Sequence, residues 1–254
     1  MTDRLPVIIA AKDEERFIGR ALERLDRGTT VPFVVTNGSS DRTAEIARGF
    51  GARVEELPES GKLPAIQYAM RELGHEALGP VLFMDADSLP FSPKRWASEM
   101  MKGMNDDKRA AVVAGTIAFN DGSPIVSALR SFKEVHRTWR IAMSGEAPID
   151  AVYGANMGLR LNTEERLEKI LELPHIWPGE DRCIASMVQR WGGDVSVSLS
   201  LGGLVLTSAR YHTSLLDRIR NGKGAVEDQS SRNYANRAAP AATHKFVDSQ
   251  LIEL

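Results

Sequence analysis

Two carboxylates stand one residue apart, at Asp85 and Asp87, directly after the apolar residues 81–84. Alternate residues of an extended chain point to the same side, so we expect the two acids to converge on one cation. Oxygen ligands at the end of a strand suit Mg²⁺ or Mn²⁺, which usually keep water and hold substrate phosphates. Asp, Ser and Pro are also turn residues, and a simple turn over residues 85–90 is the alternative.

The first ninety residues must position these acids, and there strands and helices alternate. Apolar runs predict strands at 5–11, 31–36 and 81–84, and a weaker strand is expected at 53–57. Periodicity predicts helices at 14–25, 43–49 and 62–73, the first capped by Asp13. Intervening helices demand parallel pairing, and such sheets bind ligands outside the carboxyl ends of their strands. The loops at 11–13, 36–41 and 85–88 are therefore expected to form one site.

The second half has a different order of elements. We expect a strand at 110–119, a long helix at 125–143 and an extended segment at 151–161. A helix capped by Thr163 should run to residue 173, another should carry residues 184–191 on one face, and strands at 195–207 should be broken by two glycines.

Composition fits a globular domain rather than a fibre or a membrane protein. The 254 residues are 43% hydrophobic, and the net charge of −2 gives no overall attraction to nucleic acid or anionic lipid. Cys183 is the only cysteine, so an internal disulfide is excluded, and no apolar stretch approaches membrane-spanning length. We expect a soluble, cytoplasmic protein.

Six polar segments follow one another in an order typical of a known family. They are residues 10–15, 36–43, 61–62, 84–87, 154–156 and 179–181. No single segment is specific, but the ordered set resembles the inverting nucleotide-sugar glycosyltransferases of family 2. The resemblance implies an α/β structure of the GT-A fold, with a mostly parallel central sheet flanked by helices.

The resemblance also implies roles for the matching residues. Asp181, beside Glu180, is the general base for the acceptor hydroxyl; Asp87 binds Mn²⁺ or Mg²⁺ directly, and Asp85 lies near the ribose or binds the ion through water. The residues expected around the donor nucleotide are Ala11, Asp13, Glu14, Thr36, Asn37, Gly38, Ser39, Lys62 and Asp85. Those expected to border the donor sugar and acceptor are Gly154, Ala155, Asn156 and Trp177.

Several of these residues have a second interpretation. Thr36-Asn37 stands where the family usually has two aspartates, which leaves uracil, guanine and thymine open as the base. Lys62 can be a solvated lysine, Asp181 a helix cap, Gly154 part of a strand bulge, and Trp177 a core residue. A late histidine, His212, is either a third metal ligand or a surface residue.

Two other functions remain as alternatives. A nucleotidyltransferase would carry a glycine-rich phosphate loop after the first strand, but residues 10–16 contain no glycine. A non-catalytic nucleotide-sugar-binding module on the same fold is the other alternative, and the intact acids at 85, 87 and 181 argue against it.

We expect one GT-A domain over residues 1–210, with a nucleotide-binding half to about residue 90 and an acceptor-binding half beyond it. Residues 211–254 read as a polar, basic extension. The acceptor stays open between a glycan, a lipid-linked molecule and a small molecule. A nucleic-acid hydroxyl is possible but not favoured, since the basic residues near 210–245 are explained as well by a solvated tail.

Overall fold

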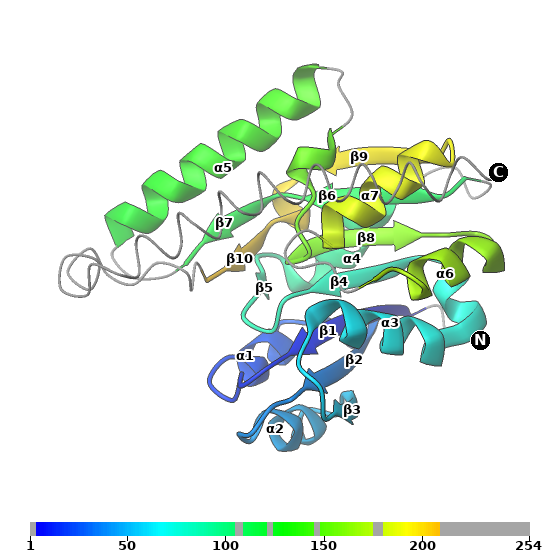
Figure 1. Ribbon diagram of the computed structural model, residues 1–254. Coiled ribbons are helices and arrows are strands. Elements are labelled where there is room, and N and C mark those ends of the chain that lie inside the picture. The colour runs from blue at the N-terminus through cyan, green and yellow to red at the C-terminus, as the bar shows by residue number, and fades with distance from the viewer. Residues whose placement is uncertain (1–3, 105–108, 121–123, 145–147, 175–179, 209–254) are drawn as a thin grey trace, which may run out of the picture.

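The computed structural model describes residues 4–104, 109–120, 124–144, 148–174 and 180–208 (Figure 1). Its centre is a seven-stranded sheet in the order β3-β2-β1-β4-β8-β6-β9. The strands of this sheet are β1 (Leu5–Ala11), β2 (Thr30–Asn37), β3 (Arg53–Leu57), β4 (Val81–Met84), β6 (Ala111–Gly115), β8 (Asn156–Arg160) and β9 (Asp194–Ser198).

Most pairs in this sheet are parallel. β1 pairs in parallel with β2 and β4, β2 with β3, and β6 with β9, whereas β8 runs antiparallel to both of its neighbours. The parallel half corresponds to the predicted alternation of strands and helices, since parallel neighbours need a crossover connection. The carboxyl ends of β1, β2 and β4 therefore lie at one edge, as predicted from their loops.

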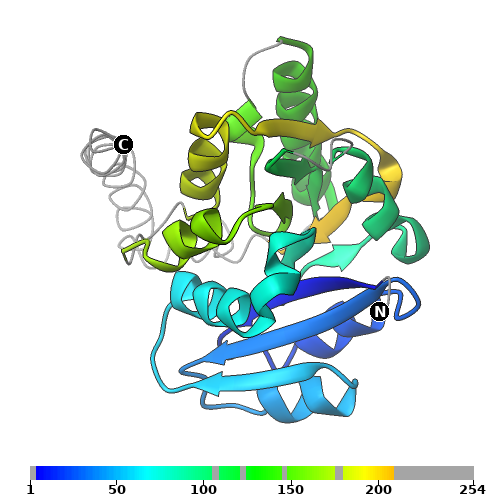
Figure 2. The same cartoon turned by 90° about the vertical axis from the view of Figure 1, so that its right-hand side faces the viewer.

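Helices cover both faces of the sheet, in three layers (Figures 1 and 2). The helices are α1 (Ile18–Glu23), α2 (Thr43–Gly49), α3 (Lys62–Leu73), α4 (Pro93–Lys102), α5 (Pro124–Ser144), α6 (Glu164–Leu171) and α7 (Glu180–Arg190), with 3-10 turns η1 (Gly74–Leu78), η2 (Pro148–Ala151) and η3 (Leu201–Gly203). No helix within the described ranges is both long and apolar enough to cross a bilayer.

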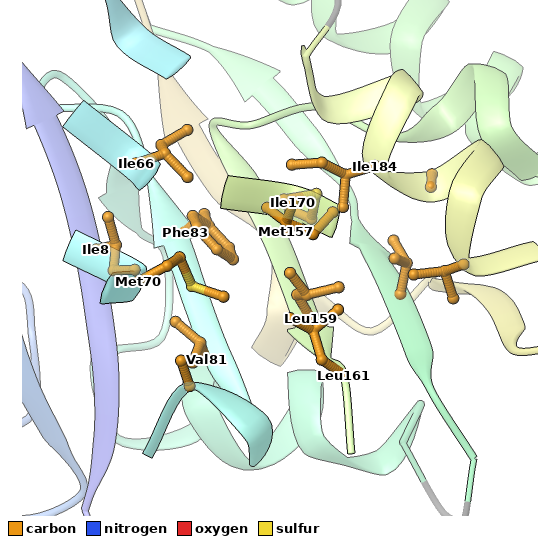
Figure 3. Close-up of a cluster of buried hydrophobic side chains, with 14 of the residues drawn as sticks. Ile8, Ile66, Met70, Val81, Phe83, Met157, Leu159, Leu161, Ile170 and Ile184 are labelled. Atoms are coloured by element: carbon orange, nitrogen blue, oxygen red, sulfur yellow. The ribbon is translucent and has the colours of Figure 1, made fainter. Parts of the chain in front are cut away.

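The central strands are apolar on both faces because both faces are covered. Ile8 and Phe83 pack in one core with residues of α3, α6 and α7, shown in Figure 3. Their neighbours Val7 and Leu82 pack in a second core with residues of α1 and α4. Continuous apolar runs of this kind are typical of strands buried on both sides.

The loop after β4 leads into a second sheet of three strands. It has the order β5-β10-β7 and consists of β5 (Leu89–Pro90), β7 (Ile117–Phe119) and β10 (Val205–Thr207). The predicted strand at 110–119 is therefore two strands, β6 and β7. They part at Thr116, whose hydroxyl donates to the Ser198 carbonyl at 2.8 Å and whose carbonyl accepts from Val205 N–H at 3.1 Å.

Two helix starts test the capping predictions. Thr163 caps α6, because its hydroxyl accepts from Arg166 N–H at 3.3 Å, as predicted. The predicted Asp13 cap is wrong: α1 begins at Ile18, and no side chain caps it. Asp13 instead has a left-handed backbone, with φ 54°, and its side chain bonds to the loop after β2.

Candidate active site

The loops after β1 and β2 are bonded to each other through Asp13. Its backbone N–H donates to Ser39 Oγ at 3.1 Å, and its Oδ1 accepts from Ser40 N–H at 2.8 Å. Ser39 Oγ lies 3.4 Å from the Ala11 carbonyl, to which it donates. These contacts bring the predicted nucleotide-binding residues of the two strands together, at the edge where ligands of parallel sheets bind.

A second layer of hydrogen bonds, which the sequence reasoning did not assign, holds the same two loops. Thr43 Oγ1 accepts from Glu14 N–H at 2.7 Å and donates to Asp41 Oδ1 at 2.5 Å, while Asp41 Oδ2 accepts from Glu15 N–H at 3.0 Å. Desolvation alone would raise the pKa of Asp41, but these hydrogen bonds outweigh it and lower that pKa. The carboxylate stays ionised and fixes the loop.

The last two residues of β2 are polar and buried. Thr36 and Asn37 are 2% and 5% exposed, and Asn37 Oδ1 finds no hydrogen-bond partner within the described part of the chain. Gly38 follows with φ 71°, and a Cβ there would lie 3.3 Å from the Pro58 carbonyl oxygen. The turn therefore requires glycine, and it leaves one buried amide oxygen able to accept a hydrogen bond.

Lys62 is the centre of a charged cluster drawn from separate segments. Its Nζ lies 2.5 Å from Asp85 Oδ1 and 3.6 Å from Glu180 Oε1. Asp181 is joined to this cluster through Gly154, whose N–H donates to Asp181 Oδ2 at 2.9 Å. The structure thus brings together the first turn of α3, the end of β4, the segment before β8 and the first turn of α7.

The charges within this cluster shift one another. Desolvation alone would lower the pKa of Lys62, but Asp85, Glu180 and Asp181 outweigh it and raise that pKa, so the lysine stays charged. Desolvation, followed by the charge of Glu180, raises the pKa of Asp181, despite opposition from Lys62 and two backbone N–H groups. A carboxylate with a raised pKa is a stronger proton acceptor when ionised.

The charged cluster leaves no room for a side chain at Gly154. A Cβ at Gly154 would lie 2.8 Å from Lys62 Nζ and 3.8 Å from Glu180 Oε1. The ammonium is itself held by Asp85, so it has little freedom to move away. The glycine is therefore needed for this close approach.

The acid doublet after β4 does not continue the strand. Ser88 N–H donates to the Asp85 carbonyl at 3.0 Å, so residues 85–88 form a turn, and the expected extended alternation is wrong. Asp85 binds Lys62, while Asp87 Oδ1 accepts from Thr207 Oγ1 at 3.4 Å. Thr207, which the sequence reasoning missed, comes from β10, 120 residues further along the chain.

The oxygen ligands present are compatible with a divalent cation. Asp85 and Asp87 are half-buried, and Thr207 adds a hydroxyl beside Asp87. No group of three or more His, Cys, Asp or Glu in the described ranges is close enough to hold an ion alone. Mg²⁺ and Mn²⁺ sites with one or two carboxylates are ordinary where substrate phosphates complete the shell, so this donor set fits.

The side chain of Asn156 is directed into the core, although the residue pairs with Met84, directly before Asp85. It is fully buried; its Oδ1 accepts from Trp96 Nε1 at 3.0 Å, and its Nδ2 donates to the carbonyls of Thr116 and Gly203 at 2.9 and 2.8 Å. Its side-chain groups are engaged in joining β8 to α4, to the β6–β7 break and to η3. Ala155 is buried as well, at 7% exposure.

Tyr153, directly before Gly154, is a neighbour that the sequence did not reveal. Its hydroxyl donates to Glu134 Oε2 at 3.0 Å and accepts from Arg137 Nη1, both on α5. Desolvation and the charge of Glu134 raise the pKa of Tyr153 to about 12, so the phenol stays neutral. Trp177 and His212 lie outside the described residues.

Comparison with known proteins identifies the family of this chain. The model of the family described as "Glycosyl transferase family 2" matches residues 7–157. A dolichyl-phosphate hexose transferase of Haloferax volcanii is 41% identical over 70 residues, which are 27% of this chain and 31% of that protein. That alignment therefore spans less than a third of the relative's length.

Solved structures share the fold. A mannosyltransferase of Pyrobaculum calidifontis, in complex with GDP-Man and Mn²⁺, superposes with a TM-score of 0.59 at 18% identity, over 88% of this chain and 62% of its own. Glucosyl-3-phosphoglycerate synthase of Mycobacterium tuberculosis, in complex with Mn²⁺, UDP-glucose and phosphoglyceric acid, superposes with a TM-score of 0.52 at 18% identity. The superposition covers 85% of this chain and 74% of that one. The predicted GT-A fold is confirmed, and the chain belongs to glycosyltransferase family 2.

Proposed function

We propose that this protein is a metal-dependent, inverting glycosyltransferase that moves a hexose from a nucleoside-diphosphate hexose to an acceptor oxygen. The observation that carries the proposal is the cluster of Lys62, Asp85, Glu180 and Asp181. It places a half-buried ammonium and a carboxylate of raised pKa within one connected set of contacts, next to the loops of three parallel strands. Perturbed charged groups gathered at such an edge are typical of active sites.

In this proposal the donor lies across the carboxyl ends of β1, β2 and β4. Asn37 Oδ1, at the end of β2, is an acceptor without a hydrogen-bond partner among the described residues, and a rotation of its side chain would offer it to a base N–H. The residues that bond to Asp13, chiefly Ser39 and Ser40, keep the two nucleotide loops together. Lys62 offers a fixed positive charge to the diphosphate, since its pKa is raised and it stays protonated.

Asp87 would bind the metal, with Asp85 nearby, and the metal when bound would neutralise charge on the departing diphosphate. Asp85 Oδ1 also accepts a hydrogen bond from Lys62. The ammonium and the metal would therefore both be positioned by carboxylates of the same turn, Asp85 and Asp87. The Mn²⁺ in both solved relatives, and their GDP-Man and UDP-glucose, support this class of donor and metal.

Asp181 would act as the general base. The Gly154 N–H fixes its Oδ2 and the Arg182 N–H donates to its Oδ1 at 2.8 Å, so the carboxylate is oriented before substrate binds. An inverting transfer needs one carboxylate to take the acceptor proton as the acceptor oxygen attacks the anomeric carbon from the face opposite the diphosphate. Burial beside Glu180 gives Asp181 the raised pKa suited to that task.

The proposed catalytic unit is residues 1–210, because one sheet joins β1 to β9 across both halves of that range. The acceptor stays open. The relative from Haloferax is named for dolichyl phosphate and the one from Mycobacterium for phosphoglycerate, so phosphate-bearing acceptors should be screened first, then glycans.

A thermal-shift screen of nucleotide hexoses with and without Mn²⁺ tests the proposal. One donor should raise the melting temperature by mass action, only when Mn²⁺ is present, and should then release its nucleoside diphosphate on addition of an acceptor. Stabilisation by a donor without any turnover, across the acceptor classes, would favour a non-catalytic binding module. Release of pyrophosphate from a nucleoside triphosphate would favour a nucleotidyltransferase.

A further inference from the structure

Helix α5 has its polar side toward the protein and its apolar side outward. Its fully buried side chains are Ser127 and Thr138, which are both polar. The most exposed large apolar residues of α5, with their exposed fractions, are Ile125 (73%), Leu129 (66%), Phe132 (73%), Trp139 (51%) and Met143 (67%). A surface helix of a globular domain normally shows the reverse, so the outward side of α5 is built for contact with something other than water.

These residues form one continuous stripe. They follow one another at spacings of four, three, seven and four residues, which keeps them on one side of a helix. His136 fills the longest gap, because its ring lies 6.1 Å from that of Phe132 and 6.2 Å from that of Trp139. The stripe runs for roughly 27 Å along a helix that Figure 1 shows at the margin of the molecule.

The polar contacts on the inner side fix the rotation of α5. Ser131 Oγ accepts from Phe119 N–H at 2.8 Å, Glu134 accepts from the Tyr153 hydroxyl, and Arg137 donates to the same hydroxyl. Turning the apolar stripe inward would break these contacts. The exposed stripe is therefore a consequence of specific bonds, and nothing in the described part of the chain covers it.

The charge of α5 differs from that of the whole chain. The helix carries four basic residues, Arg130, Lys133, Arg137 and Arg140, against the single acid Glu134, in a chain with a net charge of −2. Lys133 and Arg140 are exposed and lie beside Phe132 and Trp139 in sequence. An apolar stripe with tryptophan and phenylalanine, flanked by basic side chains, is the pattern of helices that lie in the surface of an anionic membrane.

We propose that α5 docks on an anionic lipid surface, with its apolar stripe inserted among the headgroups and acyl chains and the exposed Lys133 and Arg140 on the lipid phosphates. A second copy of the chain is a poorer occupant, since pairing two such helices would bring like charges together. The proposal does not depend on the proposed function. Docking would also put the active site beside the bilayer, because Tyr153, held by α5, directly precedes the Gly154 that binds Asp181.

Vesicle co-sedimentation of the full chain tests this. The protein should sediment with vesicles of phosphatidylglycerol and phosphatidylcholine in equal parts, and much less with phosphatidylcholine alone or at high salt. Phe132→Ser should weaken binding about tenfold or more, since it removes one inserted aromatic side chain. Leu201→Ser is the matched control: Leu201 is also apolar and 73% exposed, but lies on η3, and its replacement should leave binding unchanged.

Three outcomes would overturn the proposal. They are no sedimentation with anionic vesicles, equal sedimentation with neutral ones, and an equal loss of binding in the Phe132 and Leu201 variants. Sedimentation velocity without lipid is run in parallel. A dimer that Phe132→Ser dissociates, together with no vesicle binding, would assign the stripe to a second copy instead.

Discussion

Replacing Lys62 with methionine should destabilise the protein in a pH-dependent way. Methionine keeps most of the aliphatic volume and removes the ammonium that lies 2.5 Å from Asp85 and 3.6 Å from Glu180. At an effective dielectric constant of about 20, these distances correspond to attractions of about 7 and about 5 kcal/mol. Desolvation of the ammonium opposes them, so the net cost is smaller than either figure.

The loss of stability expected for Lys62→Met can be judged from the known cost of breaking buried ion pairs. Breaking a buried pair by removing one partner costs about 3–5 kcal/mol, because an uncompensated charge is left behind. Here the side chain of Glu180 is 7% exposed but that of Asp85 is 34% exposed, so solvent screens part of the loss. We expect Lys62→Met to lower the free energy of unfolding by about 2–4 kcal/mol at neutral pH.

The pH dependence separates this charge effect from a packing defect. Burial and the charge of Glu180 already raise the pKa of Asp181, and without the opposing charge of Lys62 that pKa should lie further above its value in the unfolded chain. Stability of the variant should then fall as pH rises from the unfolded carboxylate range through the raised folded values. The deficit against wild type should therefore be small near pH 4 and reach its full size near pH 7.

Urea denaturation of both proteins across that range measures the deficit. The control is Lys169→Met, which removes a lysine 2.9 Å from Glu165, a residue whose side chain is 71% exposed. This surface pair should contribute less than about 1 kcal/mol. A Lys62→Met deficit that is the same at every pH, or no larger than that of the control, would refute the reasoning.

Three further predictions concern the metal, the core and acid stability. Asp87→Ala should abolish the Mn²⁺-dependent part of donor binding measured by calorimetry, and unchanged Mn²⁺ dependence would remove Asp87 from the metal site. Asn156→Ala should cost about 2–4 kcal/mol in urea denaturation, because it leaves Trp96 Nε1 and two carbonyls unpaired, whereas the exposed control Asn120→Ala should change stability by less than about 0.5 kcal/mol. Hydrogen bonds from Lys102 and Arg95 lower the pKa of Glu99 to about 2, so its stabilising contribution is present above pH 4.5 and is lost as pH falls toward 2; Glu99→Gln should flatten that loss, and an unchanged acid profile would contradict it.

The sequence predicted the nucleotide-binding half well because its signals are local. The strands β1, β2 and β4 are short apolar runs followed by polar residues, and parallel pairing then brings those polar residues to one edge. The contact between Asp13 and Ser39 and the approach of Lys62 to Asp85 follow from that topology. Helix periodicity likewise located α3 and α5 within a residue or two.

The errors arose where a distant partner decides the outcome. The sequence gives no sign that the side-chain amide of Asn156 binds Trp96, 60 residues away, in the core. Asp13 was predicted to cap a helix, but its side chain accepts a hydrogen bond from Ser40 N–H in the loop after β2. The turn at Asp85 depends on β5 pairing with β10, whose Thr207 is 120 residues from Asp87, and no local pattern indicates that pairing.

The inverted sidedness of α5 was beyond prediction for a related reason. Periodicity shows that a helix is amphipathic, but it does not show which side meets the protein. Tyr153 decides that here, by engaging both Glu134 and Arg137 on the polar side.

The most direct test of the central claim compares donor binding and transfer in Asp181→Asn. Asparagine keeps the shape of the side chain and an oxygen that can accept from Gly154 N–H, but it cannot take the acceptor proton. Donor affinity with Mn²⁺ should be unchanged by calorimetry, while the rate of transfer should fall about 10²–10⁴-fold. Transfer at the wild-type rate would contradict the assignment of Asp181 as the base.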